Sequence, residues 1–400
     1  MAAQDILKQA IHSPFPRLRR LLDGIAPGGT PIEMTIGEPR HPMPAFLMDE
    51  LNASAAGFAK YPPINGTPEL RKSISDWLGR RYGLAGAIDP ELHILPLNGS
   101  REGLFTAIFP AIDRRPKTPR PAVLIPNPFY QAYLAAALGA GAEPVMLAAT
   151  AATGFLPDLD ALATDHALLG RTAAFFLCSP ANPQGAVASP AYLERAIRLA
   201  RQHDFMLFAD ECYSEIYPVQ PPPGALEIAQ AATGSLANVM ALNSLSKRSN
   251  LPGLRSGFAA GDPEFIERFT QFRNVAAPQM PLPVMAASTA VWQDEAHVEA
   301  SRRLYQEKFD AAAAILGNQF GDVRPAGGFF LWLEMSQIGG GEAAAVTLWK
   351  RCGVKVLPGA YLAYEDDKGA DPASAYVRIA LVQDLATTRT ALERLVSVLE

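Results

Sequence analysis

The sequence has few cysteines, no block of basic residues and no long apolar run. Its three cysteines, Cys178, Cys212 and Cys352, are scattered and form no CxxC or Cys/His cluster, so neither a disulfide framework nor a metal site is predicted. The formal net charge of -5 argues against nucleic-acid binding. No uncharged apolar stretch could cross a bilayer, and residues 1–10 lack the apolar core of a signal peptide. These absences predict a cytoplasmic protein with no metal, membrane or nucleic-acid partner.

What the sequence does contain is a series of short apolar runs that alternate with helical stretches. The 400 residues, 49% of them hydrophobic, are enough for one large and one smaller domain. Apolar runs lie at 92–97, 122–125, 143–147, 173–178, 205–209 and 239–242. This alternation predicts an α/β fold whose largely parallel sheet has helices on both faces. We expect a large domain at residues 46–285, and a smaller α+β domain formed by 286–400 together with an N-terminal arm, 1–45.

Polar residues follow five of these runs, where the ligand site of a parallel sheet is expected. The strand ends carry Asn98-Gly99-Ser100, Asn127 to Tyr130, Ser179 to Asn182, Asp210 to Tyr213, and Ser244 to Lys247. Lys247 lies next to Ser246, with Arg255 a short loop away. Such a lysine can form a Schiff base and such an arginine can hold a phosphate dianion, which is the pair that pyridoxal phosphate (PLP) requires. Taken alone, this segment fits a basic surface turn equally well; the other strand ends favour the site.

Two further charged residues occupy apolar surroundings. Asp210 ends the run at 205–209, where a buried carboxylate is costly unless it is paired. Arg378 lies inside an apolar strand and needs an anion, either a substrate carboxylate or a structural salt bridge.

Together, these motifs resemble those of the class I and II aminotransferases. The resemblance rests on Asn98-Gly99-Ser100, Tyr130, Ser179-Pro180-Ala181-Asn182-Pro183-Gln184-Gly185, Asp210-Glu211-Cys212-Tyr213, Ser244-Leu245-Ser246-Lys247, Arg255 and Arg378, and it spans nearly the whole chain. It implies the PLP-dependent transferase fold type I, in which the large domain has a mostly parallel seven-stranded sheet. It also implies pyridoxal 5'-phosphate as cofactor and an obligate homodimer with shared active sites.

The resemblance implies a role for each site residue. Lys247 would bind the cofactor as a Schiff base and serve as the catalytic base, Asp210 would pair with the protonated ring nitrogen, and Tyr213 would contact the phenolic oxygen. Asn182 would bind the same oxygen and the substrate, and Tyr130 would stack on the ring. The phosphate would be bound by Gly99, Ser100, Arg101, Ser244, Ser246 and Arg255, with Tyr61 from the neighbouring subunit. Arg378 and Gly37 would bind the substrate's α-carboxylate.

Longer strings resemble one branch of the family, the bacterial N-succinyldiaminopimelate aminotransferases of lysine biosynthesis. These strings are 36–39, 127–131, 210–217 and, above all, 246–258. The implied reaction transfers an amino group between glutamate and N-succinyl-2-amino-6-oxopimelate, in two half-reactions through pyridoxamine phosphate. Both substrates carry a distal carboxylate, for which Arg101 and Arg40 are candidates by position; phosphate-side packing and a solvated loop charge are their alternatives.

One segment departs from that branch. Residues 272–279 do not repeat the expected string, so other reactions stay open: aspartate, aromatic or acetylornithine-like amino transfer, or a PLP lyase. A PLP-dependent transcription regulator would need a helix-turn-helix domain ahead of the fold, and the first thirty residues are too few for one.

Overall fold

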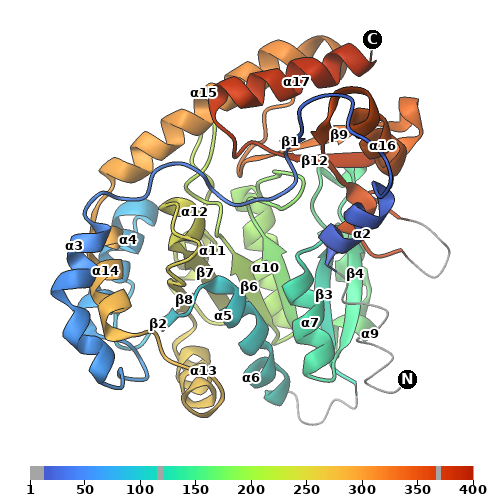
Figure 1. Ribbon diagram of the computed structural model, residues 1–400. Coiled ribbons are helices and arrows are strands. Elements are labelled where there is room, and N and C mark those ends of the chain that lie inside the picture. Colours follow the sequence, from blue (N-terminus) through green and yellow to red (C-terminus); the bar gives the residue numbers. More distant parts are fainter. Residues whose placement is uncertain (1–12, 115–119, 366–370, 400) are drawn as a thin grey trace.

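The computed structural model describes residues 13–114, 120–365 and 371–399 (Figure 1). The expectations for residues 1–10 and for the beginning of the N-terminal arm lie outside these ranges. The element order is α/β through the first two thirds of the described chain and mixed thereafter. No helix in the described ranges is both long and apolar enough to span a bilayer.

A seven-stranded sheet forms the centre of the larger part (Figure 1). Its strand order is β2 (Ile94–Leu97), β8 (Gly257–Gly261), β7 (Val239–Ser244), β6 (Met206–Asp210), β5 (Thr172–Cys178), β3 (Ala122–Asn127) and β4 (Glu143–Ala148). All neighbouring strands are parallel except where β8 pairs with β2 and β7. The predicted seven-stranded, mostly parallel sheet is therefore confirmed.

Helices cover both faces of this sheet, which explains why its inner strands read as continuous apolar runs. One apolar cluster contains Trp77, Phe258 and Trp292, and the cluster on the other face contains Tyr133 and Phe208. The helices are α3 (Leu47–Ala53), α4 (Pro68–Tyr82), α5 (Ser100–Thr106), α6 (Ile108–Asp113), α7 (Gln131–Gly139), α8 (Leu159–Thr164), α9 (His166–Leu169), α10 (Pro190–Gln202), α11 (Ala225–Thr233), α12 (Leu245–Arg248), α13 (Pro263–Ala276) and α14 (Leu282–Gln293), with the 3-10 turns η1 (Ala55–Ala59) and η2 (Ala151–Thr153).

The remaining elements surround a third apolar cluster. Its strands are β9 (Phe330–Glu334), β11 (Leu357–Pro358) and β12 (Tyr376–Ala380), which form an antiparallel sheet, and β1 (Ile32–Glu33), which pairs in parallel with β10 (Val354–Lys355). Its helices are α2 (Pro14–Leu21), α15 (Ala296–Phe320), α16 (Gly340–Cys352) and α17 (Leu385–Leu399), with η3 (Ser336–Ile338) and η4 (Gly359–Tyr361). Leu18 and Met34 pack into this cluster, so the arm joins the smaller part.

The sequence from 282 to 316 predicts one long helical stretch, whereas the structure has two helices there. The chain leaves α14 at Asp294, whose side chain accepts a hydrogen bond from the backbone N of His297 at 3.1 Å as α15 begins. Trp292, in α14, lies in the core of the larger part, and α14 packs against α3 and α4. The expected boundary at 285 therefore falls inside one packed helix, and the exact division into domains stays a prediction.

Candidate active site

The five polar strand ends meet at one edge of the large sheet. Strands β2, β3, β5, β6 and β7 run in the same direction, so the loops that follow them leave from the same side. The loop after β7 enters the short helix α12, where Ser244 caps the turn by accepting a hydrogen bond from the Ser246 backbone N at 3.1 Å. This turn presents Lys247 at the edge.

Lys247 lies in a buried, largely apolar environment. Its amine donates to the carbonyl oxygen of Gly37, and its Nζ is 5.4 Å from the ring centroid of Phe329 and 6.0 Å from that of Tyr213. Burial, reinforced by the charge of Arg378, lowers the pKa of this amine to about 8. With a pKa of about 8, about a tenth of the Lys247 amine is uncharged at pH 7, the state in which an amine attacks a carbonyl carbon.

Asp210 ends β6 as a buried carboxylate. Its Oδ2 accepts a hydrogen bond from the Tyr133 hydroxyl at 2.7 Å, and its Oδ1 accepts one from the Cys212 backbone N at 3.3 Å. Burial raises the pKa of the carboxyl group. It forms no salt bridge with any residue in the described ranges, so a ligand N–H carrying positive charge would suit it. The ring nitrogen of PLP has this chemistry.

Arg378 is a buried arginine without an acidic partner in the described part of the chain. On β12, it is only 5% exposed, and burial lowers its pKa to about 10. Its two Nη atoms donate to the carbonyl oxygen of Thr35 at 2.7 Å and to Oδ1 of Asn182 at 2.9 Å, whereas its Nε has no hydrogen-bond partner among the residues that the structure describes. The structural salt bridge considered for Arg378 is absent from these residues. The geometry suits a carboxylate ligand.

A second anion site lies around Gly99 and Arg255. Gly99 has φ of 81°, a backbone conformation that favours glycine, and a Cβ built there would force the Arg255 guanidinium to shift. Arg255 donates to the carbonyl oxygens of Pro252 at 2.8 Å and Asn98 at 3.2 Å, and no described carboxylate pairs with it. The hydroxyls of Ser244 and Ser246 are 2.8 Å apart, at the start of α12. Hydroxyls and a guanidinium without a carboxylate fit a phosphate dianion.

The other expected residues have more varied surroundings. The Ser100 hydroxyl accepts a hydrogen bond from the Cys212 thiol at 2.9 Å. The hydroxyl of Tyr130 accepts a hydrogen bond from Nε of Arg101, and the ring of Tyr213 packs edge-on against Phe329 and Phe330. Tyr61 is fully exposed and takes no part in the site of its own chain.

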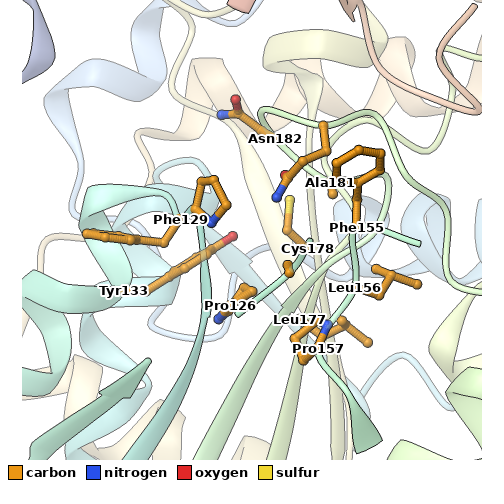
Figure 2. A pocket seen from close by; sticks show the side chains of 13 residues that line it. Pro126, Phe129, Tyr133, Phe155, Leu156, Pro157, Leu177, Cys178, Ala181 and Asn182 are labelled. Atoms are coloured by element: carbon orange, nitrogen blue, oxygen red, sulfur yellow. The ribbon is translucent and has the colours of Figure 1, made fainter. Parts of the chain in front are cut away.

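A small cavity behind the site is too small for a substrate. Figure 2 shows Tyr133, Cys178 and Asn182 among its walls. Its volume is about 10 Å³, roughly the space of one water molecule. It lies between the ends of β3 and β5, below the polar edge.

Sequence reasoning missed several contacts of the site. Tyr133 follows Tyr130 by one helical turn and binds Asp210, while Cys212 lies inside a motif already singled out. Their positions were visible, but no periodic signal marked them as partners. Thr35 binds Arg378 through its backbone carbonyl, and because every residue type has one, the sequence could not predict this contact.

Comparisons with known proteins agree with this geometry. The family model described as "Aminotransferase class I and II" matches residues 30–395. An LL-diaminopimelate aminotransferase from Desulforudis audaxviator is 30% identical over 95% of this chain and 94% of its own. A solved aminotransferase from Neisseria meningitidis is 41% identical, with a TM-score of 0.91 over 98% of each chain. A probable N-succinyldiaminopimelate aminotransferase from Thermus thermophilus is 25% identical, with a TM-score of 0.82 over 96% of this chain and 100% of its own.

Proposed function

The chain belongs to the class I and II aminotransferases, and on this premise we propose that it transfers an amino group between glutamate and N-succinyl-2-amino-6-oxopimelate in lysine and diaminopimelate biosynthesis. The enzyme uses pyridoxal 5'-phosphate, the cofactor of this family. The observation that carries the amino-transfer chemistry is the arrangement of Lys247 and Arg378: a buried amine with a pKa of about 8 and a buried guanidinium with a free Nε. The choice of the succinylated substrate is supported by the resemblance of the strings named above and by the Thermus thermophilus neighbour. Both use backbone carbonyls of the segment 35–37 as partners.

We assign the chemistry to the chain's own residues as follows. When bound, PLP supplies an aldehyde that captures amines and a ring that withdraws electrons from the substrate's α-carbon. Lys247 would hold the bound cofactor through its amine, and its Nζ, when uncharged, would take and return the proton of the substrate's α-carbon. Asp210 holds a proton on the ring nitrogen, because its buried carboxylate needs a cationic donor.

The remaining residues bind and orient. Arg378 binds the substrate α-carboxylate through its free Nε and adjacent Nη, beside Gly37. Asn182 accepts from Arg378 with its Oδ1, which leaves its amide nitrogen to donate to the phenolic oxygen of the cofactor beside the Tyr213 hydroxyl. Tyr130 packs on the cofactor ring. The phosphate contacts are assigned to Gly99, Ser100, Arg101, Ser244, Ser246 and Arg255.

Of the two arginines considered for the distal carboxylate, we assign Arg101. Its Nε is held by the Tyr130 hydroxyl, and its charge is among those that lower the pKa of Lys247, after burial itself. Arg40 instead donates to Oε1 of Gln383 at 2.6 Å in an exposed loop. Arg101→Met should therefore lower the ratio of kcat/KM for glutamate to that for alanine, which has no distal carboxylate. An unchanged ratio would leave Arg101 with the phosphate role alone.

Amino transfer on LL-2,6-diaminopimelate, without the succinyl group, is a second candidate. It is supported by the Desulforudis audaxviator relative, which is named for that substrate. The two reactions share glutamate and 2-oxoglutarate and differ in the partner. They are distinguished by offering LL-diaminopimelate as the amino donor and measuring the glutamate formed from 2-oxoglutarate.

The deciding experiment is an acceptor panel with glutamate as donor. It should include N-succinyl-2-amino-6-oxopimelate, the acceptor of the diaminopimelate reaction, and oxoacids of the aspartate and aromatic type. The succinylated acceptor should give the highest kcat/KM, and glutamate alone should change the cofactor absorbance with release of 2-oxoglutarate. A preference of orders of magnitude for another acceptor would refute the substrate, and an unchanged spectrum would refute the donor.

We also propose a homodimer in the cytoplasm. Tyr61 is fully exposed and Phe58 is largely exposed on the same segment, which supports contact with a second copy whose phosphate site Tyr61 completes. The three cysteines are free and buried, as is usual in a reducing compartment. Sedimentation should give a dimer. Mixing Lys247→Ala with Tyr61→Ala chains should restore activity above that of either variant, because one mixed site is intact; no restoration would contradict shared sites.

A further inference from the structure

A buried ion pair lies directly behind the phosphate site. Arg273, on α13, is 1% exposed and faces Glu102 on α5. The contact is bidentate: Nε donates to Oε1 at 2.9 Å, and Nη2 donates to Oε2 at 3.0 Å. The other terminal nitrogen donates to the carbonyl oxygen of Pro96, at the end of β2, at 3.1 Å. The guanidinium thus ties α13 to both sides of the loop between β2 and α5.

Glu102 also contacts the loop itself, and Arg273 shares a carbonyl acceptor with Asn98. Oε2 of Glu102 accepts a hydrogen bond from the Asn98 backbone N at 3.3 Å. The Asn98 side chain donates to the carbonyl oxygen of Pro278 at 2.6 Å, and Arg273 donates to the same carbonyl at 3.4 Å. The carbonyl oxygen of Asn98 then accepts a hydrogen bond from Arg255 at 3.2 Å. Asn98 is therefore held from three directions, immediately before Gly99.

We propose that Glu102 and Arg273 are positioning residues that hold the loop Asn98-Gly99-Ser100 and, through Asn98, the Arg255 guanidinium in the geometry that binds the cofactor's phosphate. The inference rests on the phosphate role proposed above for Gly99, Ser100 and Arg255. It also gives a role to the segment 272–279, the part of the sequence that departs from the branch it otherwise resembles.

The geometry favours a role in positioning the loop 98–100 over a purely structural ion pair between α5 and α13. An ion pair that only joins α5 to α13 would need no contact beyond the two charges. Here Asn98 also hydrogen-bonds Glu102 and the Pro278 carbonyl, and its own carbonyl oxygen accepts a hydrogen bond from Arg255. No hydrogen bond or ion pair joins Glu102 to Arg255 within the described ranges, so Glu102 acts on Arg255 through Asn98. Loss of the pair should therefore impair recognition of the phosphate more than recognition of the aldehyde.

The test compares PLP with pyridoxal, which has the aldehyde but no phosphate. Dissociation constants for both are measured by absorbance on the full chain freed of cofactor, for the wild type and for Arg273→Met, Arg273→Lys and Glu102→Gln. The wild type should bind PLP much more tightly. Arg273→Met should reduce the preference for PLP over pyridoxal at least tenfold. Arg273→Lys keeps the charge but cannot make the two-bond contact of a guanidinium, so it should restore part of the preference.

The control is Arg171→Met, which removes another two-bond contact, to Glu143, at the opposite edge of the sheet. It should leave the preference for PLP over pyridoxal unchanged. The positioning role is refuted if Arg273→Met, Arg273→Lys and Glu102→Gln all keep the wild-type preference for PLP over pyridoxal. It is also refuted if Arg171→Met lowers this preference as much as they do. If Arg273→Met does not fold, Arg273→Lys and Glu102→Gln decide. A wild type without preference for PLP would instead refute the phosphate site itself.

Discussion

Replacing Glu211 by glutamine should stabilise the protein increasingly as the pH rises from 5 to 8. Glu211 is buried behind the site, where its Oε1 accepts a hydrogen bond from the Ala225 backbone N at 2.7 Å and its Oε2 accepts one from the Tyr82 hydroxyl at 3.2 Å. Burial raises the pKa of this carboxyl group from 4.5 to about 7. The folded chain therefore holds the Glu211 proton more tightly than the unfolded chain.

The sign and size of the effect follow from this difference. Because the pKa is raised on folding, the stabilisation is complete below pH 4.5 and is lost as the pH rises through about 7. At about 1.4 kcal/mol per pKa unit, the wild type loses about 2 to 3 kcal/mol between pH 5 and pH 8. Glutamine does not titrate. It can still accept from Ala225 and can donate to the Tyr82 oxygen, so the variant should avoid this loss.

Urea unfolding of the cofactor-free chain at pH 5 and pH 8 measures the effect. Tryptophan fluorescence reports on this core, because the ring centroid of Trp77 is 5.8 Å from that of Tyr82. Glu299→Gln is the control, since this exposed residue forms a loose ion pair with Arg303 in its own helix, at 3.8 Å, and its replacement should leave the wild-type pH dependence. Parallel stability curves for the wild type and Glu211→Gln would refute the reasoning.

Three further predictions concern the site. Because burial lowers the pKa of Lys247 to about 8, capture of PLP by the cofactor-free chain should accelerate with pH and level off above about 8; Lys247→Arg should abolish the absorbance change. Arg378→Met should raise the KM for glutamate about 100-fold, because a lost buried charge pair costs roughly 2–5 kcal/mol. Gly99→Ala should weaken PLP binding about tenfold in titrations, since its Cβ collides with Arg255 at a positive φ.

Each of these has a contrary outcome. A capture rate that does not vary with pH would show that Lys247 is not the titrating amine. If Arg378→Met leaves the KM for glutamate unchanged, Arg378 does not bind the substrate. If the methionine variant does not fold, the KM of Arg378→Lys, which keeps the positive charge, is measured instead. For Gly99, the control is Gly83→Ala, which has a positive φ but no atom near the new Cβ, and equal losses in both variants would exclude a collision.

Local signals predicted many elements correctly. Thr67 followed by Pro68 is a typical helix start, and the sequence predicts a helix that continues to about Tyr82. The helix spans Pro68–Tyr82, and the Thr67 hydroxyl accepts a hydrogen bond from the Leu70 backbone N at 3.4 Å. Capping residues and apolar runs act over a few neighbours, so the sequence shows them directly. The break at Asp294 was missed because both flanking segments have helical character. In the structure, Asp294 accepts a hydrogen bond from the His297 backbone N, and α14 packs against α3 and α4.

The sequence by itself determined the α/β alternation, the order of the polar strand ends, and the pairing of Lys247 with an arginine a short loop away. These depend on residue types and spacings along one segment. Only the tertiary structure decided which charges lack a partner, as at the Nε of Arg378, and which are neutralised, as in the pair of Glu102 and Arg273, whose residues lie 171 positions apart. The reason is physical: whether a buried charge meets an opposite charge depends on how separate elements pack, and no local pattern encodes that distance.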